Sequence, residues 1–147
     1  GWRIAFSGPD VTVELDTKTF FCTGPSIFIE SHTARSVGIY RDLVVAQQTR
    51  YRLQVAYRQE DTILSDLLVR IQFRDQTNKP TAPHLEINGA QGQAMCEGWY
   101  VLHTEFQIPP NVHNIRLELL LWRTEGRVWW DDVWLFQKVN WKNDADG

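Results

Sequence analysis

Several features that most functional classes require are missing from the sequence. Its 147 residues carry a formal net charge of −3, so the chain lacks the basic surface with which proteins bind nucleic acid or an anionic membrane. No apolar run approaches the roughly 20 residues that span a bilayer. We therefore expect neither nucleic acid nor a membrane among its partners.

Catalytic and metal-binding motifs are also absent. The four histidines lack the spacing of zinc ligands, and the chain has no nucleophile motif and no glycine-rich phosphate loop. Only two cysteines occur, Cys22 and Cys96, and they allow one disulfide without requiring it in a domain of this length. These absences point away from an enzyme.

What the chain does have is an abundance of aromatic residues, with seven tryptophans, seven phenylalanines and four tyrosines. No segment keeps the 3.6-residue apolar period of a helix over ten residues, whereas short stretches with two-residue alternation recur between Gly, Pro, Asn and Asp. The sequence therefore predicts an all-β fold. The expected strands cover residues 11–15, 26–31, 37–45, 51–59, 67–74, 84–88, 100–108, 115–122 and 128–139.

Alternation along these strands predicts which side chains face the core. In residues 51–57 the odd positions are apolar and face one way, while the polar positions face the other. In residues 115–121 the odd positions again form the core set. The outward set of that strand is Arg116, Glu118, Leu120 and Trp122. An apolar pair beside an acid and a guanidinium is unusual on a plain solvated face and favours a ligand platform.

The run from Gly126 to Leu135 is the densest aromatic segment. Because its aliphatic residues take the core positions, Trp130 and Trp134 are expected on the outer face of their sheet. There they would form a second binding strip or contact a neighbouring domain. Trp99 and Trp129 are assigned to the core or its edge.

Short motifs spread over almost the whole chain carry a resemblance to a known group of domains. They are Gly1-Trp2-Arg3, Asp16 followed by Gly24-Pro25-Ser26-Ile27, Tyr51-Arg52-Leu53, Gly98-Trp99 leading to Phe106-Gln107-Ile108-Pro109, and Gly126 through Leu135. With these motifs in this order, the chain resembles the jelly-roll carbohydrate-binding modules of families 4, 9, 16 and 22. Such modules are often appended to polysaccharide-degrading enzymes. The joint order is specific for this superfamily, but it does not identify the sugar.

The resemblance implies a two-sheet antiparallel β-sandwich (jelly roll) over residues 1–139, followed by a polar tail or linker at 140–147. One sheet is implied to be concave and to carry a glycan cleft. Its expected strands are residues 37–45, 67–74, 84–88 and 115–122. The candidate ligand-binding residues on its outer face are Tyr40, Arg70, Gln72, Arg74, His84, Glu86, Arg116, Glu118, Leu120 and Trp122, with Trp2 and Trp99 at the rim.

The types of these residues fit a sugar ligand. Sugars present C–H patches that stack on aromatic rings and hydroxyls that need donors and acceptors. Trp122 and Glu118, with Tyr40 and Gln72 facing them across the sheet, offer both kinds of group. The alternative is that either ring packs under a loop, as large side chains often do.

Arg70, Arg74 and Arg116 have two interpretations. One is a carboxylated sugar such as a uronate, because a guanidinium pairs bidentately with a carboxylate. The other is cross-strand pairing with Glu86 and Glu118, which needs no acidic ligand. The sequence leaves both open.

The Asp131-Asp132 pair falls in a predicted strand, although carboxylates are poor strand formers and are rarely buried unpaired. The resemblance favours a structural Ca²⁺, held by Asp carboxylates together with a backbone carbonyl. The alternatives are pairing with Arg127 or Lys138, or hydrogen bonds from backbone N–H groups. The predicted metal ligands are Asp16, Gly24, Asp131 and Asp132.

Together these observations predict a non-catalytic module that binds a polysaccharide or oligosaccharide and keeps an attached carbohydrate-active enzyme near its substrate. The resemblance implies a monomeric module within a secreted or extracellular protein that carries its catalytic domain on the same chain. One alternative is a structural or adhesion β-sandwich that joins domains without binding sugar. Another is a small jelly-roll polysaccharide lyase or hydrolase, for which Glu86 and Glu118 are the only carboxylate pair on one face.

Overall fold

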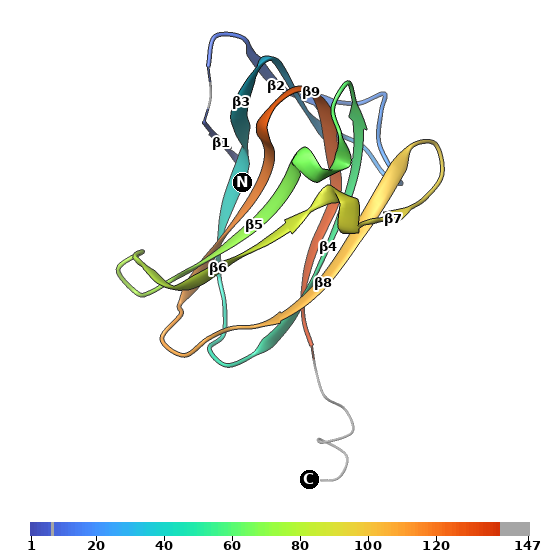
Figure 1. The fold of residues 1–147 in the computed structure, drawn as a ribbon. Coiled ribbons are helices and arrows are strands. Elements are labelled where there is room, and N and C mark those ends of the chain that lie inside the picture. The colour runs from blue at the N-terminus through green and yellow to red at the C-terminus, as the bar shows by residue number, and fades with distance from the viewer. Residues whose placement is uncertain (7, 139–147) are drawn as a thin grey trace.

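The computed structural model describes residues 1–6 and 8–138, and this part of the chain consists mainly of β-strands (Figure 1). The strands are β1 (Arg3–Ala5), β2 (Val11–Asp16), β3 (Ser26–Val44), β4 (Arg50–Glu60), β5 (Leu67–Arg74), β6 (Pro80–Asn88), β7 (Gln93–Ala94), β8 (Trp99–Gln107) and β9 (Asn114–Gln137). Two short 3₁₀ helices, η1 (Leu64–Asp66) and η2 (Gly89–Gln91), flank the β5–β6 hairpin. No described helix is long and apolar enough to cross a membrane. The all-β prediction is confirmed.

Two long strands, β3 and β9, build both layers of the sandwich. The C-terminal half of β3 pairs with the N-terminal half of β9, which also pairs with β5, and β1 and β6 add at the edges. We call this layer sheet I. The other halves of β3 and β9 pair with each other and with β2 and β4, and β8 and β7 follow. We call this layer sheet II, and all pairings in both layers are antiparallel.

The two-sheet antiparallel sandwich and the strands predicted for the ligand-bearing sheet are therefore confirmed. The prediction separated residues 26–31 from 37–45, and 115–122 from 128–139, whereas each pair belongs to one continuous strand. Register shifts near Arg35 bend β3 without ending it, as β-bulges do. The last residue of the final predicted strand and the predicted tail at 140–147 lie outside the described residues.

The core lies between the sheets and follows the predicted alternation. The odd positions of residues 51–57 and 115–121 are buried, as are Val69, Ile71 and Phe73. Packing of these side chains from both layers into one cluster removes a large apolar area from water, which is the main favourable term in folding.

The expected outward position of Trp130 is wrong, because a β-bulge interrupts β9. Trp134 pairs with Gln54 and Asp131 pairs with Ala56, so β9 has one more residue than β4 across this step. Asp132 takes a left-handed φ of 44° there. The extra residue reverses the alternation, and Trp130 is only 1% exposed in the core, whereas Trp134 faces outward as expected.

The outer face of sheet II carries a second apolar cluster. Trp99 and Trp129 are buried there beneath Phe21 and Phe28, with ring centroids 5.7 Å apart for Phe21 and Trp99 and 5.0 Å apart for Phe28 and Trp129. The buried state expected for both tryptophans is confirmed. Trp99 does not lie at the rim of sheet I, because β8 belongs to sheet II.

Candidate functional site

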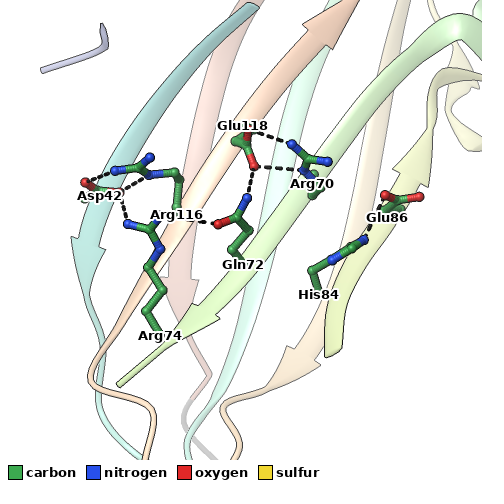
Figure 2. A network of polar contacts seen from close by, with 8 residues as sticks. All are labelled: Asp42, Arg70, Gln72, Arg74, His84, Glu86, Arg116 and Glu118. Carbon is green, nitrogen blue, oxygen red and sulfur yellow. Dashed lines mark hydrogen bonds and ion pairs between the residues drawn. The ribbon is translucent and has the colours of Figure 1, made fainter. Parts of the chain in front are cut away.

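The outer face of sheet I gathers the candidate ligand residues in cross-strand rows. The register places Tyr40 opposite Glu118, Glu118 opposite Arg70, and Arg70 opposite Glu86. The neighbouring rows hold Asp42, Arg116, Gln72 and Arg74. Figure 2 shows the polar members of this group converging from β3, β9, β5 and β6. The structure therefore brings the predicted residues of this face together.

Glu118 lies at the centre of the polar network. Its carboxylate accepts hydrogen bonds from Arg70 Nε at 2.8 Å and Nη2 at 3.0 Å, and from Gln72 Nε2 at 2.7 Å (Figure 2). The side chains of Glu118 and Arg70 are only 4% and 13% exposed. The hydrogen bonds to Glu118 raise the pKa of Arg70 above its ordinary value. A bidentate pair of this kind is rigid and internally neutral.

Asp42 is a member of this face that the sequence interpretation missed. It accepts hydrogen bonds from Arg116 Nε at 2.8 Å and Nη2 at 3.0 Å, and Arg74 Nη1 lies 3.9 Å from its Oδ1 (Figure 2). Hydrogen bonding to Arg116 lowers the pKa of Asp42. The signal was present, because alternation along β3 puts Asp42 on the same face as Tyr40.

Tyr40 and His84 mark the more open part of this face. The Arg116 guanidinium lies 4.0 Å from the centroid of the Tyr40 ring, a cation–π contact. A pocket of about 210 Å³ beside that ring is lined by Gly1, Arg3, Tyr40, Arg41 and Asp42. Across the sheet, His84 Nε2 lies 2.9 Å from Glu86 Oε1, and both side chains are about half exposed.

Trp122, at the opposite end of the face, is flanked by two guanidinium groups. Arg70 and Arg123 lie 5.2 Å and 5.4 Å from its ring centroid. On the outer face, Arg70 lies one cross-strand row before Leu120, and Trp122 lies one row after it. The contact between Arg70 and Trp122 therefore covers Leu120. Leu120 is accordingly on the predicted face but fully buried, and it offers no open platform.

Gly38 forms part of the floor at this closed end. It pairs with Leu120 across β3 and β9. A Cβ at position 38 would lie 2.1 Å from the Leu119 carbonyl oxygen and 2.6 Å from Leu120 Cδ2. Only glycine allows the backbone of β3 to approach Leu120 this closely.

Trp2 does not lie on the outer face of sheet I. Its neighbour Arg3 pairs with Tyr40 on that face, so the Trp2 side chain points the other way and packs against the core. It lines an opening of about 320 Å³ between the sheets. The lining residues are Trp2, Arg41, Leu43, Val44, Tyr51, Leu117, Val133 and Leu135.

The predicted metal ligands are largely occupied by N–H donors. Asp16 accepts hydrogen bonds from Trp129 Nε1 at 2.9 Å and from two backbone amides. Asp131 accepts hydrogen bonds from the backbone amides of Phe21 and Asp132, at 2.8 Å each. Backbone hydrogen bonding was the alternative to a cation for this aspartate. Pairing with Arg127 or Lys138 is not what the structure shows, because those side chains pair with other carboxylates.

The side chains as placed do not form a cage for a cation. Within the described residues, no group of three or more His, Cys, Asp or Glu side chains could hold a metal ion. Asp132 stands apart, because burial and the adjacent charge of Asp131 raise its pKa. Calcium therefore stays a prediction. Cys22 and Cys96 are free and exposed.

Comparison with known proteins bears on the fold. No family model matches the chain, and no curated protein matches it by sequence. Solved structures do match. The family 22 xylan-binding domain of a Paenibacillus barcinonensis xylanase superposes with a TM-score of 0.65 at 12% identity, over 95% of this chain and 88% of that one.

Two larger structures match over a part of their length. The family 22 module and catalytic module of Clostridium thermocellum xylanase 10B, complexed with xylohexaose, match with a TM-score of 0.71 and 15% identity over 95% of this chain. The enzymatically active domain of tailspike protein 4 of bacteriophage CBA120 matches with a TM-score of 0.72 and 14% identity over 93% of this chain. The chain spans only 26% and 19% of these two structures.

Modules of families 4 and 16 match as well, with TM-scores of 0.61 and 0.59. At 10–17% identity these likenesses establish the architecture and leave the ligand open. The expected resemblance is confirmed at the level of structure: the chain has the β-sandwich fold of the carbohydrate-binding modules of families 4, 16 and 22.

Proposed function

We propose that this chain is a non-catalytic module that binds a glycan on the outer face of sheet I. The observation that carries the proposal is the polar network of that face, which four neighbouring strands assemble beside the Tyr40 ring. Sugar recognition needs a ring to stack on and fixed donors and acceptors around it. Shared architecture with carbohydrate-binding modules supports the same conclusion.

The open part of the face, around Tyr40, Asp42 and Arg116, is the better place for the sugar. Asp42 is about half exposed and Arg116 about a quarter, whereas the Glu118–Arg70 pair is nearly buried. Hydroxyl groups would meet the carboxylate of Asp42 and the free N–H groups of Arg116. Glu118 would act indirectly, by holding Arg70 and Gln72 in position.

A neutral glycan fits this face better than a uronate polymer. Arg70 and Arg116 each already pair bidentately with a carboxylate of the protein. An acidic sugar would have to displace Glu118 or Asp42, and breaking such a pair leaves an uncompensated charge. Cross-strand pairing accounts for Arg70 through Glu118, and for Arg116 through Asp42 in place of the expected Glu86.

The polar network also argues for binding without catalysis. A glycosidase needs one carboxyl group that is free to donate a proton to the leaving oxygen. Both oxygens of Glu118 accept hydrogen bonds from cationic or amide groups, so Glu118 is not available for that role. We further propose that the module belongs to an extracellular protein and holds a linked catalytic domain near its polymer, because tethering raises effective concentration.

Affinity gel electrophoresis tests the proposal. The protein is run through gels containing soluble xylan, mixed-linkage β-glucan, galactan or polygalacturonate. We expect retardation by a neutral polymer, weakened about tenfold by Tyr40→Ala, the equivalent of about 1.4 kcal/mol. Phe20→Ala is the matched control, because Phe20 is an exposed ring on the loop between β2 and β3 and not on the outer face of sheet I.

Other outcomes would identify the alternatives. Migration unaffected by every polymer would contradict glycan binding and favour a structural sandwich. Release of reducing or unsaturated ends from a polymer would establish an enzyme instead. Retardation by polygalacturonate alone would show that the neutral-glycan assignment is wrong.

A further inference from the structure

A second aromatic surface lies on the outer face of sheet II, far from the polar network. Trp134 and Phe136, near the C-terminal end of β9, are 52% and 48% exposed. Their ring centroids are 6.0 Å apart and their planes differ by only 5°. Three other outward rings of this sheet, Phe28, Trp99 and Trp129, pack in a separate cluster with Phe21. We call Trp134 and Phe136 the aromatic strip.

Polar side chains border the aromatic strip on the neighbouring strands. The register places Gln54 beside Trp134 and Arg52 beside Phe136 on β4. On β8, His103 lies opposite Gln54, with its Nδ1 3.1 Å from Arg52 Nη2. An amide, an imidazole and a guanidinium thus stand next to two parallel rings.

The size and surroundings of the strip fit a small flexible polymer better than a protein partner. Two half-exposed aromatic rings offer roughly 200 Å² of ring surface, well below the roughly 800 Å² per partner of a stable protein interface. Arg52 and the Lys138–Glu105 ion pair border this patch and add hydrogen-bonding groups beside the rings. A glycan needs only ring faces and adjacent donors.

We infer that the aromatic strip is a second glycan-binding site, in which the exposed part of the Trp134–Phe136 stack packs against a sugar ring and Gln54 and His103 bind its hydroxyls. The site rests on different residues from those of the proposed site on sheet I. Because the two sites lie on the outer faces of opposite sheets, one molecule binds two polymer chains at once. Binding to a polymer therefore gains from avidity.

The test separates the two sites by paired variants in gels containing soluble xylan, mixed-linkage β-glucan or galactan. One variant carries Tyr40→Ala and Arg116→Ala on sheet I, one carries Trp134→Ala and Phe136→Ala on the strip, and one carries all four. We expect the sheet I variant to keep residual retardation, the strip variant to lose at least tenfold in apparent affinity, and the fourfold variant to migrate as in a gel without polymer. Trp134→Tyr, which keeps a ring, restores most of the strip contribution.

Several outcomes would overturn this second site. The strip variant binding as tightly as the unchanged protein, or the sheet I variant losing all retardation, would leave only the site on sheet I. No retardation of the unchanged protein by any of the three polymers would contradict both sites. Self-association in sedimentation velocity that Trp134→Ala abolishes would identify the strip as a contact between copies of the chain. Thermal melting of each variant verifies that it remains folded.

Discussion

The outer faces of the two sheets differ in how their side chains are satisfied. On sheet I, charged groups pair with one another around the nearly buried Glu118. On sheet II, aromatic rings stand among the outward groups. Trp129 is buried beneath Phe28 near one end, whereas Trp134 and Phe136 are exposed near the other.

This difference reflects two ways of preparing a surface for a ligand. Charged groups that are partly buried need partners even when no ligand is present, so a polar face is ordered in advance but occupied by its own contacts. Aromatic rings need no such partner, so they are either covered by other apolar side chains or open. Sheet I therefore offers positioned donors and acceptors, and sheet II offers free stacking surface.

The largest expected effect contrasts two tryptophans of β9 on either side of the bulge. Trp130→Ala removes a buried core ring and is expected to lower the free energy of unfolding by about 3–5 kcal/mol. Trp134→Ala removes an exposed ring and is expected to change it by less than about 0.5 kcal/mol. Urea denaturation followed by circular dichroism measures both. Equal losses of unfolding free energy would contradict a bulge that buries Trp130 and exposes Trp134.

The next effect concerns the centre of the polar face. Glu118→Ala leaves the Arg70 guanidinium nearly buried without its carboxylate, and we expect a loss of about 3 kcal/mol. Glu86→Ala is the control, because Glu86 lies on the same face but is about half exposed, and a change below about 1 kcal/mol is expected. Denaturation in urea distinguishes them. A mild effect of Glu118→Ala would contradict a preorganised network.

A smaller effect concerns the hydrogen bond from Trp129 to Asp16, at the end of sheet II where Trp129 is buried. The hydrogen bond from Trp129 Nε1, with backbone hydrogen bonds, lowers the pKa of Asp16 below its ordinary value near 3.8. A lowered pKa contributes stability above the ordinary value, and this contribution is lost as the pH falls through the folded-state pKa. Asp16→Ala should therefore cost about 1 kcal/mol at pH 7 and progressively less below pH 4. A loss that is independent of pH would contradict this origin.

The smallest effect concerns Asp132, whose shift has the opposite sign. Burial and the charge of Asp131 raise its pKa, so its ionisation opposes folding as the pH rises above the ordinary carboxyl range. Without calcium, Asp132→Asn should raise stability by about 0.5 kcal/mol at pH 7 and have no effect at pH 3. Asparagine also tolerates the left-handed backbone at this position.

The same variant tests the predicted calcium ion. If Asp132 is a ligand, added Ca²⁺ raises the melting temperature of the unchanged protein but not that of Asp132→Asn. An identical melting temperature of the unchanged protein in excess chelator and in added Ca²⁺ would exclude a structural calcium site.

Much of the fold followed from local patterns, and the errors have identifiable causes. Alternation assigned the core residues of β4, β5 and the first half of β9 correctly. It failed at Trp130, because a single extra residue near Asp132 reverses the alternation between Trp130 and Trp134. β1 was missed because three residues are too few to show a period.

The sequence predicted which residues share the candidate site, but not which of them pair with one another. Parity gave the outward positions within each strand, and the resemblance implied that the strands of Tyr40, Glu118 and Arg70 share one sheet. Two features were not predictable: the pairing of Arg116 with Asp42, and the burial of Leu120 beneath Arg70 and Trp122. Both depend on side chains that meet across strands.

The sequence by itself determined that this chain is all-β and which side chains share a face within an uninterrupted strand segment, because a strand exposes alternate residues through its local backbone geometry. Only the tertiary structure decided which charges neutralise one another, that Trp130 is buried and that Trp134 is open. These outcomes depend on the register between strands distant in sequence and on the bulge in β9, and no two-residue pattern encodes either of them.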